Sequence, residues 1–247
     1  MTEMMKTEGL TRCELAAGSH PDLTLYECTL KAGCRYEPEL LGLDDRMQMF
    51  FFVNATGYVA TKNRAWNIKE QAIFIPNYKK EKFWIEAGEK DLKFVHIIGV
   101  MNAYDEKEYI DYHIILPNMR GKSECFRFTE YYTGKLGSTI ESRRLVLDTA
   151  FGRWFVGMND GEGQSAFVGE HTQEHLQQWN YVLPGSHFKY TVNGEEHEAK
   201  DGDVIFVPKG ASFSAKPVGE GGIHYLWIKF ASEGFPVGRD GYPGSEE

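Results

Sequence analysis

The chain has 247 residues, of which 42% are hydrophobic and 26% charged, and its formal net charge is -9. This composition is ordinary for a folded globular protein. The negative balance argues against nucleic acid or a membrane surface as partner, because phosphate groups are bound by clustered Lys and Arg. No apolar run approaches the ~20 residues that span a membrane, and the first ten residues, MTEMMKTEGL, lack the apolar region of a signal peptide. We therefore expect a cytoplasmic protein.

Short apolar runs separated by turn signals fill the first part of the chain. After a polar segment at residues 1–22, the pattern predicts strands at residues 23–30, 47–53, 58–61, 72–75 and 94–100. Residues 101–143 differ in character, with a charged stretch of weak helical spacing at 103–112, and we interpret them as a connecting segment. Further strands are predicted at residues 144–147, 154–158, 204–207 and 223–230. Many short strands at this spacing are typical of a sandwich or barrel, so the fold class is all-β.

The two halves of the chain repeat each other. The run Ile73 to Pro76 matches the run Ile205 to Pro208, in the same order relative to a preceding glycine and a following strand. Such self-similarity indicates a duplicated structural unit. It predicts a first barrel at 23–100 and a second at 144–230, flanked by an N-terminal segment at 1–22 and a Gly- and Pro-rich tail at 231–247.

The stretch from Gly169 to Ser214 carries the best candidates for chemistry. Possible metal ligands stand just before a predicted strand, at His171, Gln173, Glu174, His175 and Gln178. Imidazole and carboxylate groups suit zinc, manganese or iron. None of the four cysteines lies in this stretch or in a C-x-x-C pair, so a zinc ribbon is not indicated, and we expect reduced thiols.

Glycine and proline spacing in the second half resembles the cupin superfamily. Gly202, Pro208 and Gly210 match the second cupin motif, G-x5-P-x-G-x2-H-x3-N, and Gly185 ends the first, G-x5-H-x-H-x3–4-E-x6-G. With the weaker first half, the whole chain resembles a bicupin, which has two double-stranded β-helix (jelly-roll) barrels. The resemblance also implies self-association, so we expect a homodimer.

The ligand positions of the cupin motifs are only partly kept. Counted back from Gly185, Gln178 falls where the family has Glu. The two His positions fall on His171 and Gln173 in one register, and on Thr172 and Glu174 in the other. The histidine of the second motif falls on Phe213, which cannot bind a metal.

The run from His171 to His175 also resembles a segment of the ureidoglycine aminohydrolase bicupins, which hold a metal, normally manganese, with Glu, His, His and Gln. The match covers His171 and His175. Their Glu falls on Gly169, beside Glu170, and their Gln falls on Phe213.

The first half lacks ligands at the corresponding positions, which fall near Asp44, Arg46 and Phe50. We therefore expect the first barrel to hold no metal.

Each candidate residue has a structural alternative. His171 and His175 either bind a metal or substrate or are solvated on a loop. Glu174 is a candidate general acid or base, or an exposed charge. His224 is a candidate proton carrier, or a histidine whose bonds are satisfied elsewhere.

Strand periodicity points Gln178 inward together with Asn180 and Val182. The Gln178 amide then contacts a ligand or bonds a neighbouring side chain. Phe213 and Asn180 are expected in the substrate pocket, with Phe213 as an apolar wall.

Two functions remain open on the sequence alone. In the first, the second barrel acts on a small polar metabolite with a weakly held divalent metal, as a hydrolase, lyase or isomerase. The metal ligands would be His171, His175, Gln178 and Gln173, and Glu174 or His224 would move a proton. In the second, the chain is a non-catalytic bicupin that binds a small molecule and has lost its metal site.

Overall fold

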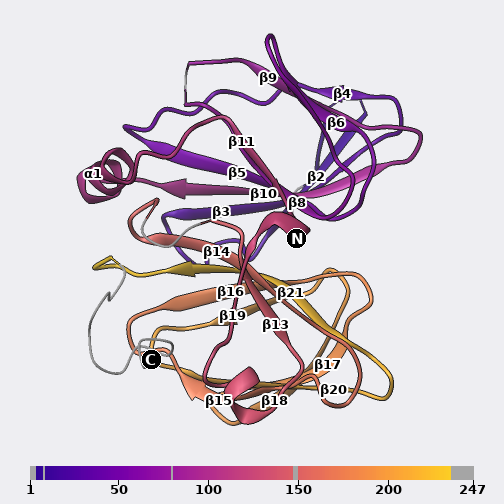
Figure 1. The fold of residues 1–247 in the computed structure, drawn as a ribbon, viewed down its shortest axis with the longest axis vertical. Helices are drawn as coiled ribbons and strands as arrows, with labels where there is room; N and C mark the ends of the chain where they lie inside the picture. The colour runs from indigo at the N-terminus through magenta and orange to yellow at the C-terminus, as the bar shows by residue number, and fades with distance from the viewer. Residues whose placement is uncertain (1–3, 8, 79, 147–149, 235–247) are drawn as a thin grey trace. The chain divides into compact units, whose positions relative to one another are not determined.

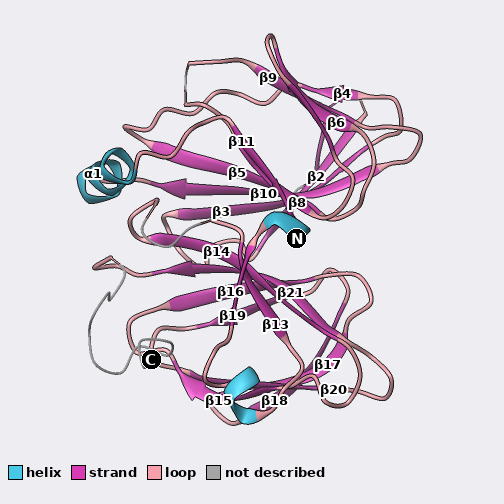
Figure 2. Ribbon diagram, viewed as in Figure 1, coloured by secondary structure: helices cyan, strands magenta, loops and turns pink. Residues whose placement is uncertain are grey.

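The computed structural model describes residues 4–7, 9–78, 80–146 and 150–234. It divides the chain into two compact units, Met1–Cys125 and Phe126–Glu247 (Figure 1). Nearly all regular structure in the described residues is β-strand (Figure 2). The predicted all-β class with two barrels is confirmed.

The first unit consists of a seven-stranded and a four-stranded antiparallel sheet. The seven-stranded sheet has the order β1 (Met4–Thr7), β2 (Leu10–Leu15), β3 (Leu23–Leu30), β10 (Leu92–Val100), β5 (Arg46–Phe52), β8 (Ala72–Ile75), β11 (Asn118–Gly121). The four-stranded sheet has the order β4 (Arg35–Tyr36), β9 (Phe83–Glu86), β6 (Tyr58–Thr61), β7 (Ala65–Asn67).

The second unit is built in the same way from a six-stranded and a four-stranded sheet. The six-stranded sheet has the order β12 (Phe126–Phe128), β13 (Glu141–Arg144), β14 (Trp154–Gly161), β21 (Ile223–Phe230), β16 (Gln177–Val182), β19 (Val204–Val207). The four-stranded sheet has the order β15 (Val168–Thr172), β20 (Ser212–Pro217), β17 (His187–Val192), β18 (Glu195–Lys200).

The sheet orders explain the internal repeat seen in the sequence. The run β3-β10-β5-β8 of the first unit corresponds to β14-β21-β16-β19 of the second. The matched runs Ile73 to Pro76 and Ile205 to Pro208 therefore begin on equivalent strands, β8 and β19. Each unit has its own apolar core, with aromatic side chains such as Phe50 and Phe94 in the first and Phe188 and Tyr225 in the second.

Residues 101–143 belong partly to each unit. α1 (Ala103–Tyr112) follows β10, and β11 pairs with β8 of the first unit. Two 3-10 turns, Lys122–Glu124 and Gly134–Leu136, flank β12, and β12 and β13 pair within the second unit. Within the segment 1–22, where the sequence predicted no strand, β2 pairs with β3. Residues 235–247 of the predicted tail, and residue 147 of the strand predicted at 144–147, lie outside the described residues.

Helix α1 begins at a complete capping box. The Asn102 side chain accepts hydrogen bonds from the backbone N–H groups of Tyr104 and Asp105, and the Asp105 carboxylate accepts one from the Asn102 N–H. Replacing Asn102 with alanine is expected to lower the free energy of unfolding by about 1 kcal/mol. Asn102→Asp keeps an acceptor and is the control. Urea unfolding of both variants checks this, and equal losses would contradict the role of the cap.

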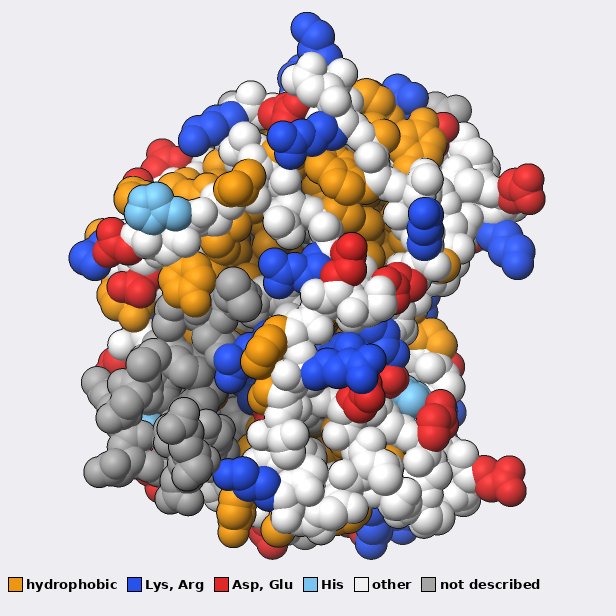
Figure 3. Space-filling view, viewed as in Figure 1, with side chains coloured by type: hydrophobic (Ala, Val, Ile, Leu, Met, Phe, Trp, Pro, Cys, Tyr) orange, Lys and Arg blue, Asp and Glu red, His pale blue; other side chains and the backbone are white. Residues whose placement is uncertain are grey.

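The described residues contain no helix long and apolar enough to cross a membrane. On the face shown in Figure 3, basic and acidic side chains lie close to one another rather than forming large fields of one sign. All four cysteines are free thiols, as expected.

Candidate functional site

Strand β16 carries two amide side chains into the interior of the second barrel. Gln178 and Asn180 share a face of this strand with Val182, which belongs to the apolar core of the unit. Gln178 is 4% and Asn180 0% exposed. The predicted inward direction of these side chains is confirmed. Trp179 points to the other face, where it stacks on Phe206.

A β-bulge in β15 turns His171 toward the same interior. Val168 pairs with Ala215 and His171 pairs with Phe213, so β15 has one residue more than β20 between the two pairs. Because side chains alternate along a strand, the extra residue lets both Val168 and His171 face inward. The His171 ring stacks on Tyr132, with 3.4 Å between ring centroids, and meets the edge of Phe213 at 6.0 Å.

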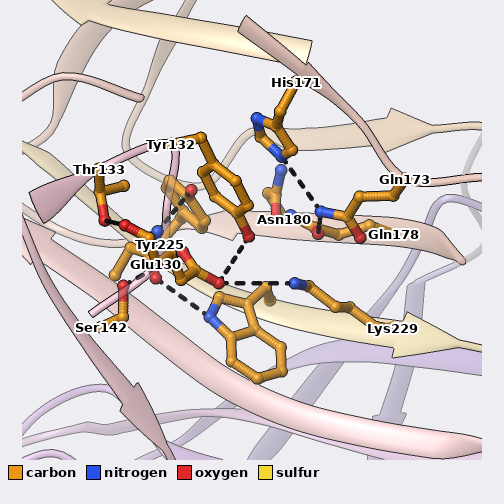
Figure 4. Close-up of polar contacts among 12 residues, drawn as sticks. Glu130, Tyr132, Thr133, Ser142, His171, Gln173, Gln178, Asn180, Tyr225 and Lys229 are labelled. Carbon is orange, nitrogen blue, oxygen red and sulfur yellow. Dashed lines mark hydrogen bonds and ion pairs between the residues drawn. The ribbon is translucent and has the colours of Figure 1, made fainter. Parts of the chain in front are cut away.

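One backbone carbonyl sets the direction of a chain of hydrogen bonds through these side chains (Figure 4). His171 Nδ1 lies 2.9 Å from the carbonyl oxygen of Gly169. A carbonyl only accepts, so Nδ1 carries the proton and Nε2 accepts from Gln173 Nε2 at 3.2 Å. Gln173 Nε2 also donates to Gln178 Oε1 at 3.0 Å, and Gln178 Nε2 donates to Asn180 Oδ1.

Two polar atoms of these amide side chains, one acceptor and one donor, take no part in the chain of hydrogen bonds. Gln173 Oε1 and Asn180 Nδ2 are buried and have no hydrogen-bond partner among the described residues. Buried polar atoms are nearly always satisfied by protein, water or a bound molecule. A water or a bound molecule is therefore expected beside each of the two atoms.

A buried carboxylate lies next to the amide chain (Figure 4). Glu130 accepts hydrogen bonds from the Tyr132 hydroxyl at 2.6 Å and from Ser142 Oγ at 3.2 Å. Lys229 Nζ lies 3.8 Å from the same carboxylate, and the side chains of Glu130 and Lys229 are only 5% and 8% exposed. The paired charges make this part of the interior polar without giving it a net charge.

Three further side chains complete the polar interior. Asn159 donates to the Tyr225 hydroxyl at 2.9 Å and accepts from Trp227 Nε1 at 3.2 Å. Burial raises the pKa of the Tyr225 hydroxyl, which therefore stays protonated. Burial also lowers the pKa of His171 to about 4, so its imidazole is neutral at physiological pH.

The structure does not bring all the predicted candidates together. Glu174 and His175 are exposed in the turn between β15 and β16, outside the buried chain of amides. In this turn their side chains are solvated, which matches the structural alternative for each. Phe213 is 2% exposed and forms an apolar wall beside His171.

His224 lies on the face of β21 opposite the interior. It faces Asp160, 2.6 Å from Nδ1, and Glu162, 3.2 Å from Nε2. Alternation along the strand puts Tyr225 and Trp227 on the face opposite to His224, and these two, not His224, belong to the core of the barrel. All residues of β21 are buried, so burial alone does not distinguish its interior face from the opposite face.

The sequence of residues 154–229 matches the family model described as "Cupin domain". This range runs from the start of β14 almost to the end of β21, and the first unit repeats its strand order. The chain therefore has the two-barrel fold of a bicupin, with a cupin domain in its second unit. No curated protein sequence matches it.

Several solved structures share the fold of this chain at low sequence identity. AerE from Microcystis aeruginosa has a TM-score of 0.68 at 8% identity, covering 93% of this chain and 97% of its own. Protein Ylba from E. coli has a TM-score of 0.69 at 10% identity, covering 94% and 87%. An oxalate decarboxylase of Bacillus subtilis has a TM-score of 0.65 at 13% identity, covering 95% and 76%. These similarities establish the architecture.

The donor set of the second barrel does not fit a divalent metal. His171 is presented as a ligand would be, with Nδ1 held by a carbonyl and Nε2 facing inward. The groups beside it are neutral amides, and the nearby carboxylate of Glu130 is engaged by Tyr132, Ser142 and Lys229. Among the described residues, no three His, Cys, Asp or Glu side chains come together in a metal-binding group.

Sequence reasoning missed Glu130, Tyr132, Ser142 and Lys229. The first three lie in the stretch interpreted as a connecting segment, and their roles depend on tertiary placement: the backbone carbonyl of Tyr132 accepts from the Gly169 N–H at 2.7 Å. Lys229 could have been identified from the sequence. It alternates with Tyr225 and Trp227 on one face of a strand, and a lysine at such a position is unusual in a buried strand.

Proposed function

We propose that the second barrel binds a small polar metabolite through hydrogen bonds to side-chain amides, without a metal ion. The observation that carries this proposal is the pair of unpartnered buried atoms, Gln173 Oε1 and Asn180 Nδ2. One accepts and the other donates, so the complementary molecule offers an N–H or O–H group together with a carbonyl oxygen. A small amide or a neutral hydroxycarbonyl compound meets both requirements.

The charges of the side chains in this interior cancel, which supports an uncharged ligand. The cation of Lys229 lies against the carboxylate of Glu130, and His171 is neutral because burial lowers its pKa to about 4. A charged ligand in this interior would find no counter-ion among these three groups. Its binding would therefore be opposed by the free energy of removing the charge from water. This supports the binding role over the metal-assisted enzyme, whose cation would also need anionic ligands here.

A calorimetric binding screen tests the proposal. The probes are acetamide, urea, glycolamide, acetate and glucose, each titrated into the full chain with and without manganese, zinc or ferrous iron. We expect binding of at least one amide, with an affinity that does not change when metal is added. Binding that requires a metal would instead support the metal-assisted hydrolase, lyase or isomerase, and each binder is then assayed for turnover.

A matched pair of variants locates the site. Gln173→Leu removes the unpartnered acceptor and is expected to weaken amide binding about tenfold, the effect of one hydrogen bond. Gln164→Leu changes an exposed glutamine of the same unit in the same way and should leave affinity unchanged. Equal affinities of both variants, or no binding by any probe, would overturn the proposal.

A further inference from the structure

The interior of the first barrel holds a second polar cluster, centred on Arg12. Arg12 lies on β2 opposite Cys28 of β3, and its guanidinium carbon is 3.7 Å from the centroid of the Tyr26 ring. Leu10, two residues before it on the same strand face, belongs to the core of this unit. Arg12 Nε is buried and has no hydrogen-bond partner among the described residues. A planar guanidinium with a buried donor to spare is suited to a carboxylate.

His96 lies next to this guanidinium across the sheet. It pairs with Tyr26 of β3 and Phe50 of β5, and its ring stacks on Phe50 with 4.2 Å between centroids. The side chain is nine-tenths buried, with 4% of the residue exposed.

The hydrogen bonds of Gln48 decide which nitrogen of His96 carries the proton. Gln48 Nε2 donates to the backbone carbonyl of Glu39 at 2.9 Å, so Gln48 Oε1 faces His96 Nε2, at 3.1 Å. His96 Nε2 is therefore the donor. Burial, and then the charge of Arg12, lower the pKa of His96 to about 3, so the ring is neutral. Nδ1 is left as a bare acceptor, buried and without a partner among the described residues.

Two further titratable groups of this interior, the Cys28 thiol and the Tyr36 hydroxyl, carry no charge. Burial raises the pKa of the Cys28 thiol to about 12 and also raises the pKa of the Tyr36 hydroxyl, so both are neutral. Arg12, Tyr26 and Tyr36 are each partly exposed, so the cluster reaches solvent. The site thus combines one cation with one neutral acceptor, close together beside aromatic rings.

We infer that the first barrel binds a small 2-hydroxycarboxylate. The guanidinium of Arg12 pairs with the carboxylate, and the adjacent hydroxyl group donates to Nδ1 of His96. A carboxylate without the hydroxyl leaves Nδ1 unsatisfied, and a hydroxyamide leaves the cation uncompensated. Of the three positions on which the ligand positions of the cupin motif fall in this half, the site uses neither Asp44 nor Arg46, and Phe50 only stacks on His96.

Titration calorimetry on the full-length Gln173→Leu variant, in which amide binding by the second barrel is weakened, tests this inference, with glycolate, acetate and glycolamide as probes. We expect glycolate to bind roughly tenfold more tightly than either of the others, because each lacks one of the two contacts. Arg12→Gln should weaken glycolate binding by roughly tenfold or more. Arg35→Gln is the matched control, since Arg35 is an exposed arginine of the same unit that also lies over an aromatic ring, that of Trp84. Its affinity for glycolate should equal that of the unchanged protein.

A histidine variant and a spectroscopic readout test the second contact. His96→Phe keeps a ring against Phe50 and should reduce glycolate affinity to that of acetate. In the unchanged protein labelled with ¹⁵N-histidine, glycolate should shift the Nδ1 resonance of His96, a readout that does not depend on how the variant folds. Unchanged glycolate binding in Arg12→Gln, or binding of none of the three probes, would overturn the inference and leave an ordered water as the partner of Nδ1. Gln173→Leu in the second barrel should not alter glycolate binding, so the two sites are tested separately.

Discussion

Replacing Glu130 with alanine is expected to lower the free energy of unfolding of the second unit by about 3–5 kcal/mol, the range for breaking a buried charged pair. The substitution removes the acceptor contacted by Tyr132, Ser142 and Lys229, all of which are buried. Urea unfolding followed by tryptophan fluorescence measures the loss.

Two controls separate this effect from general truncation. Glu174→Ala removes an exposed glutamate of the same unit and should cost less than about 0.5 kcal/mol. The double variant Glu130→Leu/Lys229→Met replaces the charges with apolar groups of similar size and should recover most of the stability. A loss in Glu130→Ala no larger than that in Glu174→Ala would show that the carboxylate contributes nothing.

Acidification is expected to destabilise both units below about pH 6.5, the ordinary pKa of histidine, through His96 and His171. Burial lowers the pKa of His96 to about 3 and that of His171 to about 4. Above pH 6.5 both histidines are neutral in the folded and the unfolded chain, so they contribute no pH dependence. Below it the unfolded chain takes up protons that the folded chain does not, and stability falls until pH reaches the folded-state pKa. At pH 5 the loss is about 2 kcal/mol for each histidine.

Unfolding curves between pH 8 and pH 4.5 measure this loss. His96→Gln should flatten the pH dependence of the first unit and His171→Gln that of the second. His197→Gln removes an exposed histidine of the second unit and serves as the control. A pH dependence as steep in the two buried-site variants as in this control would refute the assignment.

Much of the strand framework could be predicted because its signals are local. The strand predicted at 23–30 coincides with β3, Leu23–Leu30. Period-two alternation also gave the inward face of β16 correctly. These features depend on neighbours in sequence, so the order of residue types is enough to show them.

The candidate site was harder to predict because its members come from distant segments. Glu130 and Lys229 meet only after β13, β14 and β21 pair in register. Counting residues from Gly185 left two registers open, and only the pairing of β15 with β20, which includes a bulge between Val168 and His171, shows that His171 faces inward. His175 and Glu174, which resemble ligands by type, lie in the exposed turn between β15 and β16.

The extra residue in β15 bears on how this barrel changes over generations. An amino-acid exchange at Glu170 preserves the number of residues and so keeps the inward direction of His171. Loss of a single codon between Val168 and His171 would remove the bulge and leave these two residues two apart on a regular strand, so that both would still face inward. The imidazole would then stay in the interior although the segment is one residue shorter. In related genes, the presence of the histidine is therefore more informative about the site than the length of this segment.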